Sequence, residues 1–192
     1  MTLAGCGAKQ KYSSAAAKVN ATNPYYDFLK GNHQSFAGLP VEGEKQVVKL
    51  LKEYPDYAFL HYLQGQRLLD QGLINDALVE ARKATKLDPD FVDGQVFLGK
   101  LLIANSNNTE AVKVLEKVIK LDPEIYSIYP LLSRQYVLLE RYSKAVSVMK
   151  RLLKVDPEAV IAHMQVGFIY ERNLNNHRMA FKHYNKALEL EP

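Results

Sequence analysis

The chain has 192 residues, of which 47% are hydrophobic and 24% charged, a composition typical of a folded protein and not of a disordered one. Its 25 basic and 21 acidic residues leave a net charge of only +4, without any run of five lysines or arginines, so nucleic acid is not expected as a partner. No apolar stretch approaches the roughly 18–20 residues of a membrane span, and the single cysteine excludes both an intramolecular disulfide and a zinc cluster of cysteines.

Residues 1–23 are small and polar and show no core pattern, so we expect them to form a flexible tether. Within them, Leu3-Ala4-Gly5-Cys6 resembles a bacterial lipobox, whose cysteine becomes the lipidated first residue of the mature protein. The resemblance implies anchoring in the bacterial cell envelope through Cys6, as an outer-membrane lipoprotein facing the periplasm or the exterior, because Gly7 and not an aspartate follows the cysteine. Only five residues precede Cys6, fewer than a signal peptide needs, so a cytoplasmic protein is the alternative.

A repeat of 34 residues occupies the rest of the chain. Five prolines, at steps of 34, 34, 34 and 35 residues, each end a similar phrase such as KATKLDP: Pro55, Pro89, Pro123, Pro157 and Pro192. Two further columns hold small residues: Gly31, Gly65, Gly99, Ser133 and Gly167 in one, and Gly43, Ala77, Ala111, Ala145 and Ala180 in the other. Small side chains let two helices approach closely, a proline ends the helix before it, and the apolar residues between these markers recur at helical spacing. The sequence therefore predicts an all-α fold of helix pairs.

This pattern resembles the tetratricopeptide-repeat (TPR) family, whose unit of about 34 residues has small residues at its eighth and twentieth positions and a proline near its end. The resemblance implies an α-solenoid, a right-handed superhelix of about five helix-turn-helix units. They are a degenerate unit at 24–57, with helices expected at 25–36 and 42–53, and units at 58–91, 92–125, 126–159 and 160–192.

Two features depart from a regular array. Pro130 lies inside the first helix expected for 126–159, so this helix should start late or be kinked. The last expected helix, with Phe181, Tyr184 and Leu188, has no helix after it, although solenoids usually end in a polar capping helix. We expect that further repeats, a partner or a second copy of the chain cover it.

We find no sequence motif for catalysis, phosphate binding or metal binding. It has no glycine loop for phosphates and no HExxH zinc motif. His61 and His163 occupy the fourth positions of their units, where the family's bulky residue packs, and His177 and His183 are six residues apart, the wrong spacing for one helix face. Cys6 has no fixed histidine partner. We therefore expect no catalysis, no cofactor and no bound metal.

In TPR proteins the second, fifth, ninth, twelfth and thirteenth positions of each unit line a concave groove. Carried over to this chain, these positions include Leu138 and Ile161, and the residues that we expect to contact a protein or peptide ligand are Tyr25, Phe28, Asn32, Phe59, Tyr62, Gln66, Lys100, Arg134, Met164, Phe168 and Arg172. Aromatic side chains supply burial and the polar ninth positions supply orientation, which suits an extended or helical peptide with some acidic character. The alternative is that some of the aromatic residues pack beneath a neighbouring helix.

The sequence thus favours a non-catalytic, envelope-anchored TPR adaptor that binds peptide segments of partner proteins, as TPR lipoproteins of pilus and outer-membrane assembly do. Such an adaptor would serve surface or secretion machinery. Two alternatives stay open. The repeats are the N-terminal regulatory region of a larger protein, for example an enzyme, or they form an oligomerisation module that self-associates through the last helix.

Overall fold

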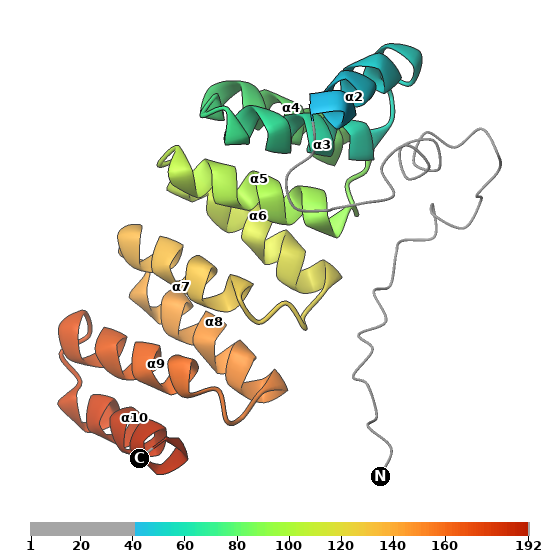
Figure 1. The fold of residues 1–192 in the computed structure, drawn as a ribbon. Coiled ribbons are helices and arrows are strands. Elements are labelled where there is room, and N and C mark those ends of the chain that lie inside the picture. The colour runs from blue at the N-terminus through green and yellow to red at the C-terminus, as the bar shows by residue number, and fades with distance from the viewer. Residues whose placement is uncertain (1–40, 192) are drawn as a thin grey trace, which may run out of the picture. The chain divides into compact units, whose positions relative to one another are not determined.

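The computed structural model describes residues 41–191, and their side chains from Val47 onward. Within that range the chain forms nine α-helices and no strand (Figure 1). They are α2 (Val41–Glu53), α3 (Ala58–Asp70), α4 (Ile74–Leu87), α5 (Val92–Ala104), α6 (Asn108–Leu121), α7 (Ile128–Leu138), α8 (Tyr142–Val155), α9 (Val160–Arg172) and α10 (His177–Leu190). The prediction of an all-α fold is confirmed for this part of the chain.

The chain divides into two units, residues 1–57 and 58–192, and α2 belongs to the first. In α2, Val47 and Leu50 are buried while Val48 and Lys49 are exposed, so one side of this helix is apolar and covered. The helix predicted at 42–53 is therefore present. The helix predicted at 25–36 lies outside the described residues.

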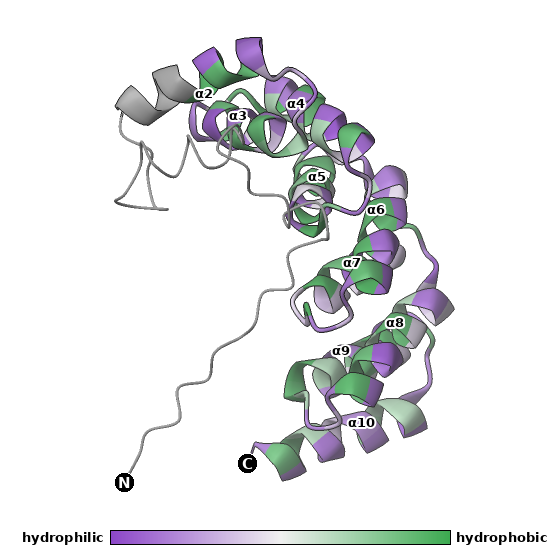
Figure 2. Ribbon diagram, turned by 90° about the vertical axis from the view of Figure 1, so that its right-hand side faces the viewer, coloured by the Kyte–Doolittle hydropathy of each residue, from purple (hydrophilic) through white to green (hydrophobic). Residues whose placement is uncertain are grey.

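In the second unit the helices form four pairs, α3 with α4, α5 with α6, α7 with α8 and α9 with α10, and each pair contacts the next mainly through its second helix. Figure 1 shows the first helices α3, α5, α7 and α9 following one another along the stack, with α4, α6, α8 and α10 as a second row. In Figure 2 hydrophilic residues lie along the outer side of α4, α6 and α8. We call the surface formed by α3, α5, α7 and α9 the first-helix face.

The turn inside each pair contains one residue in the left-handed backbone conformation: Gly72 (φ 76°), Ser106 (56°), Glu140 (57°) and Asn175 (48°). In the first pair the Leu73 amide then donates to the Leu68 carbonyl at 2.9 Å, which satisfies a carbonyl at the end of α3. These residues hold the same position in their repeats, apart from the one-residue insertion near Asn175. A repeated local conformation thus makes the four pairs alike.

The Asp-Pro phrases end the second helices. At Asp88, Asp122 and Asp156 the backbone is extended, and each aspartate Oδ1 accepts a hydrogen bond from the amide two residues later, at 3.0–3.1 Å. Such a turn, followed by a proline that cannot continue the helix, redirects the chain into the next first helix. The phrases noticed in the sequence are therefore the connections between repeats.

The small residues lie where the helices of a pair meet. A Cβ atom on Gly99 would come within 2.7 Å of Leu115 Cδ2, so no larger side chain fits there without a shift. Ser133, at the same position in the next pair, donates from Oγ to the Ala145 carbonyl at 3.2 Å, and Ala145 is fully buried. The close approach predicted from these columns is confirmed, and it brings larger side chains such as Leu132 into the core between pairs.

Hydrogen bonds and ion pairs between side chains join the second helix of one repeat to the helices of the next. Glu116 of α6 accepts hydrogen bonds from Arg151 Nη1 of α8 at 2.7 Å and from Tyr136 Oη of α7 at 3.0 Å. Arg82 of α4 forms a two-pronged ion pair with Glu110 of α6, with Nη2 2.7 Å from Oε2. Because the Glu116 side chain is only 25% exposed, its bonds are better shielded from water than those of a surface pair.

Helix α7 begins at Ile128, whereas α3, α5 and α9 begin at the first residue of the predicted units. Pro130 therefore lies in the first turn of α7, where its missing amide hydrogen is tolerated. The late start predicted for this helix is confirmed.

Candidate functional site

The N-terminal end of the first-helix face is an aromatic cluster. Tyr62 makes edge-to-face contacts with Phe91 and Phe97, at centroid distances of 5.3 and 5.5 Å, and Phe59 lies 6.2 Å from Phe91. Gln66 Nε2 donates to Tyr62 Oη at 2.8 Å. Burial raises the pKa of Tyr62, and the charge of Asp93 raises it further, against the opposing effect of the Gln66 bond.

Three predicted ligand-binding residues, Phe59, Tyr62 and Gln66, are thus half-buried and bonded to one another or to the next repeat. The rings of Phe59 and Tyr62 therefore agree with the alternative hypothesis from the sequence, in which some aromatic residues pack beneath a neighbouring helix and do not contact a ligand. The sequence did not reveal this because the partner rings belong to the connection and to the buried side of α5.

The other predicted residues within the described range lie exposed on α5, α7 and α9. Lys100, Arg134 and Arg172 are exposed, and Met164 and Phe168 expose 47% and 53% of their surface. Ile161 on α9 and Leu138 at the end of α7 are exposed by 54% and 56%. The open, apolar and cationic part of the face therefore lies over α5, α7 and α9. The remaining predicted residues, Tyr25, Phe28, Asn32 and the lipidation candidate Cys6, lie outside the described residues.

The side chain at the fourth position of each unit bonds its first helix to the preceding connection or to the second helix of the same pair. Gln95 Nε2 donates to the Pro89 carbonyl at 2.8 Å, and Tyr129 Oη donates to the Pro123 carbonyl at 3.0 Å. His61 Nδ1 lies 2.6 Å from Glu80 Oε2. The sequence predicted only packing for the residues at this position, whereas their side chains also form hydrogen bonds.

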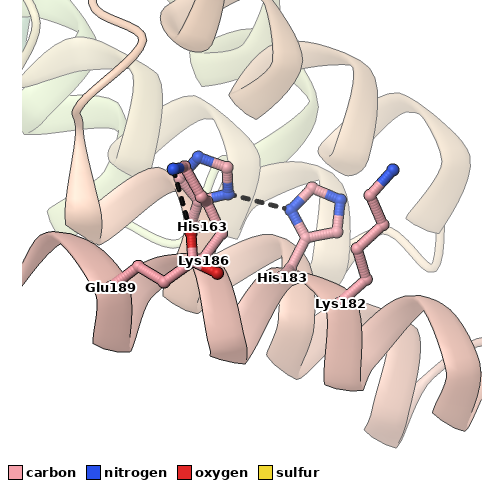
Figure 3. Close-up of a pocket in the computed structure, with 5 residues that line it drawn as sticks. All are labelled: His163, Lys182, His183, Lys186 and Glu189. Carbon is pink, nitrogen blue, oxygen red and sulfur yellow. Dashed lines mark hydrogen bonds and ion pairs between the residues drawn. The ribbon is translucent and has the colours of Figure 1, made fainter.

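In the last pair His163, at this fourth position, meets His183 of α10, with the two Nδ1 atoms 3.1 Å apart (Figure 3). One imidazole donates its ring proton to the other in this contact, and the tautomers decide which ring is the donor. Tyr170 stacks on His183 at a centroid distance of 6.0 Å. The spacing of His177 and His183 gave no indication of this pair. The alignment of the repeats does indicate it, because Glu80, the partner of His61, holds in α4 the position that His183 holds in α10.

The two rings line a cavity of about 200 Å³ together with Lys182, Lys186 and Glu189. Lys186 Nζ is 3.1 Å from Glu189 Oε2, whereas Lys182 forms no ion pair with any residue between Val47 and Glu191 (Figure 3). Burial lowers the pKa of both histidines. Within the described residues no three His, Cys, Asp or Glu side chains lie close enough together to hold a metal ion.

The expectation for the last helix needs one correction. Tyr184 does not lie on the open side of α10, because its ring covers Gly167 of α9 and its hydroxyl donates to Glu171 Oε2 at 2.9 Å. Phe181 and Leu188 are exposed by 67% and 63%. In the part of the chain described here, no helix combines the length and the apolar character needed to cross a lipid bilayer.

Comparisons with known proteins agree with this arrangement. Two sequence profiles of the tetratricopeptide repeat match residues 62–124 and 161–192. A crystal structure of MamA is similar with 25% identity and a TM-score of 0.69, over 78% of this chain and 86% of that one. The ArsTM double mutant of MamA RS-1 has 25% identity and a TM-score of 0.73, over 88% of this chain and 95% of that one. For MamA (41-end) from Desulfovibrio magneticus RS-1 the values are 24% and 0.70, over 88% and 93% of the two chains.

A comparison with curated protein sequences found no match. The two repeat profiles cover different parts of the stack, and the solved structures share its arrangement of helix pairs. The chain therefore contains tetratricopeptide repeats, stacked as an α-solenoid.

Proposed function

We propose that this protein is a non-catalytic scaffold that binds segments of other proteins on its first-helix face. The observation that carries the proposal is the exposure of large apolar side chains on α9, where a solvent-facing helix would ordinarily be polar. Repeat solenoids offer extended surfaces of this kind, built from rigid helices, and they are reused for unrelated ligands. The aromatic cluster over α3 and α5 supports this surface by fixing the first helices, and it contributes little open area of its own.

A photo-cross-linking amino acid placed on each row of helices tests this function. At Lys100 or Phe168 it should capture discrete partner proteins in cells that make the protein. At the exposed residues Val79 and Lys113 of the second row it should capture none of them. Capture of the same proteins from both rows would contradict a binding function located on the first-helix face.

A finer part of the proposal is attachment to the cell envelope. The lipobox-like Leu3-Ala4-Gly5-Cys6 supports an adaptor held at the outer membrane, where it would serve the assembly of surface or secretion machinery. Labelling of the full chain with an alkyne fatty acid, in the wild type and in Cys6→Ser, tests it. Equal labelling of the two, or none in either, would remove the anchor.

Self-association is a second candidate function, favoured by Phe181 and Leu188 on the open side of α10. The two residues are seven apart, so they lie on one side of the helix. Light scattering of the wild type and of Phe181→Ser/Leu188→Ser should show a larger assembly only for the wild type. Val79→Ser/Val155→Ser, which changes exposed residues of α4 and α8, is the matched control. A monomer at all concentrations would rule this candidate out.

A further inference from the structure

The exposed side of α9 carries an apolar row. Ile161, Met164 and Phe168 follow one another at a spacing of three and four residues, so they lie on one side of the helix over roughly 10 Å of its axis. Their exposed fractions are 54%, 47% and 53%. The opposite side of α9, which includes Ala162 and Val166, is already buried against the rest of the stack. Packing within the described chain therefore does not account for the apolar row.

Cations lie on the same first-helix face: Arg172 follows Phe168 by one turn of α9, and Arg134 in α7 and Lys100 in α5 hold the repeat position of Phe168. Lys100, Arg134 and Arg172 are exposed, and none of them forms an ion pair with any residue that the structure describes. Helix α7 contains no acidic residue. The single acidic residue of α9, Glu171, accepts the hydrogen bond from Tyr184 and is thereby held toward α10. The surface over α7 and α9 is therefore apolar and positively charged.

Building on the function proposed above, we infer that this surface binds an amphipathic helix of a partner protein with acidic residues beside its apolar stripe. An apolar row along one helix forms a ridge, and a second helix packs its own i, i+3, i+7 residues beside such a ridge. Carboxylates next to that stripe would meet Arg134 and Arg172, and guanidinium groups bind carboxylates through two parallel hydrogen bonds. A partner with lysines in the same places would be repelled.

The N-terminal end of the face does not offer the same surface. There Phe59 and Tyr62 are packed against Phe91 and Phe97. Acidic side chains also occur at that end, where Asp70 ends α3 and Asp93 opens α5, and burial raises the pKa of Asp93. The exposed cations and the exposed apolar side chains of the first-helix face therefore both favour binding of the partner's acidic helix over α7 and α9.

Two synthetic helical peptides test the inference on the full chain. They share one leucine stripe and carry either glutamates or lysines beside it. Fluorescence anisotropy should show binding of the glutamate peptide and not of the lysine peptide, with weaker binding as salt is raised. Phe168→Ala and Arg134→Ala should each weaken binding about tenfold or more. Arg134→Glu should shift the preference toward the lysine peptide, and Val79→Ala on the second row should change nothing.

Equal binding of the two peptides would overturn the inference, as would an affinity that Phe168→Ala leaves unchanged. The inference would also be overturned if the protein bound vesicles of anionic phospholipid and did not distinguish the two peptides. The surface would then recognise a membrane and not an acidic helix. If a cross-linker at Phe168 captures partner proteins while the glutamate peptide does not bind, this inference fails and the function proposed for the face stands.

Discussion

The facing imidazoles of His163 and His183 should make the last helix pair sensitive to acid. Burial lowers the pKa of His183, and the charges of His163, Lys150 and Lys182 lower it further. Burial also lowers the pKa of His163, where the bond to the Pro157 carbonyl opposes the effect and Lys186 adds to it. Tyr170 stacks on His183 without adding a charge, and Glu189 is held by Lys186. Both rings therefore stay neutral in the folded protein at a pH where an unfolded histidine, with a pKa of about 6.5, already takes up a proton.

The direction of the pH effect follows from this difference. Below about pH 6.5 the unfolded chain binds protons that the folded chain does not bind, so the free energy of unfolding falls as the pH is lowered. Each such proton changes it by about 1.4 kcal/mol per pH unit. His183 is only 9% exposed, whereas His163 is more accessible and contributes less. A histidine that stays neutral in the folded protein contributes about 1 kcal/mol between about pH 6.5 and about pH 5.5, so we expect the two together to lower the free energy of unfolding by no more than about 2 kcal/mol.

The carboxylate at the equivalent position of the first pair acts in a separate range. Burial raises the pKa of Glu80, but the hydrogen bonds with His61 and Lys83 outweigh burial and leave the pKa below its ordinary value of 4.5. The stabilisation from Glu80 is therefore present above that value and is lost only as the pH falls below it. Glu80 therefore does not account for acid effects above about pH 5.

Urea unfolding followed by far-UV circular dichroism at pH 7.5, 6.5 and 5.5 measures the effect. Because repeat arrays can unfold in parts, amide hydrogen exchange in α9 and α10, corrected for intrinsic rates, should accompany it. The matched variant is His163→Gln/His183→Val, since the equivalent positions of the second pair hold Gln95 and Val114. In that pair the glutamine keeps the bond to the proline carbonyl. A midpoint independent of pH in the wild type, or an equal shift in the double variant, would refute the reasoning.

Three further changes test the packing. Glu116→Ala leaves the buried Tyr136 hydroxyl without its acceptor, so urea unfolding should show a loss of about 1–3 kcal/mol. Gln135 is 1% exposed and its Oε1 has no hydrogen-bond partner among the described residues, so Gln135→Leu should stabilise the protein by about 1–2 kcal/mol in the same assay. A Cβ on Gly167 would lie 2.6 Å from Tyr184 Cε1, so Gly167→Val should displace that ring and lower the melting temperature, at a cost of about 1–3 kcal/mol.

The sequence was sufficient to predict the helix pairs, because the features that define them act over short distances. A proline ends a helix wherever it stands, and Gly65 or Ala77 marks a close helix contact whatever surrounds it. The late start of α7 was predictable from Pro130 for the same reason.

Side-chain partners across helices were harder to predict. Whether Tyr62 faces a ligand or Phe97 depends on the crossing of α3 and α5, which the spacing of residues within one helix does not specify. The pairing of His163 with His183 could not be predicted for a related reason, because the two residues lie on different helices and spacing within one helix does not relate them. Comparing the fourth position of each unit with the position opposite it in the second helix would have revealed the pair.

Helix α9 joins the acid-sensitive contact to the proposed binding surface. His163 faces α10, and the adjacent Met164 belongs to the apolar row that would contact a partner. The imidazoles take up protons when α9 separates from α10, so acid favours the separated state, in which the row loses the rigid support of a packed helix. We therefore expect the glutamate peptide to bind more weakly at pH 5.5 than at pH 7.5 in the wild type, and with nearly equal affinity at both values in His163→Gln/His183→Val. The glutamates stay ionised at both values, because their pKa is about 4.3. An equal loss of affinity in both proteins would show that acid acts on the surface cations or on the peptide, and not through the histidine pair.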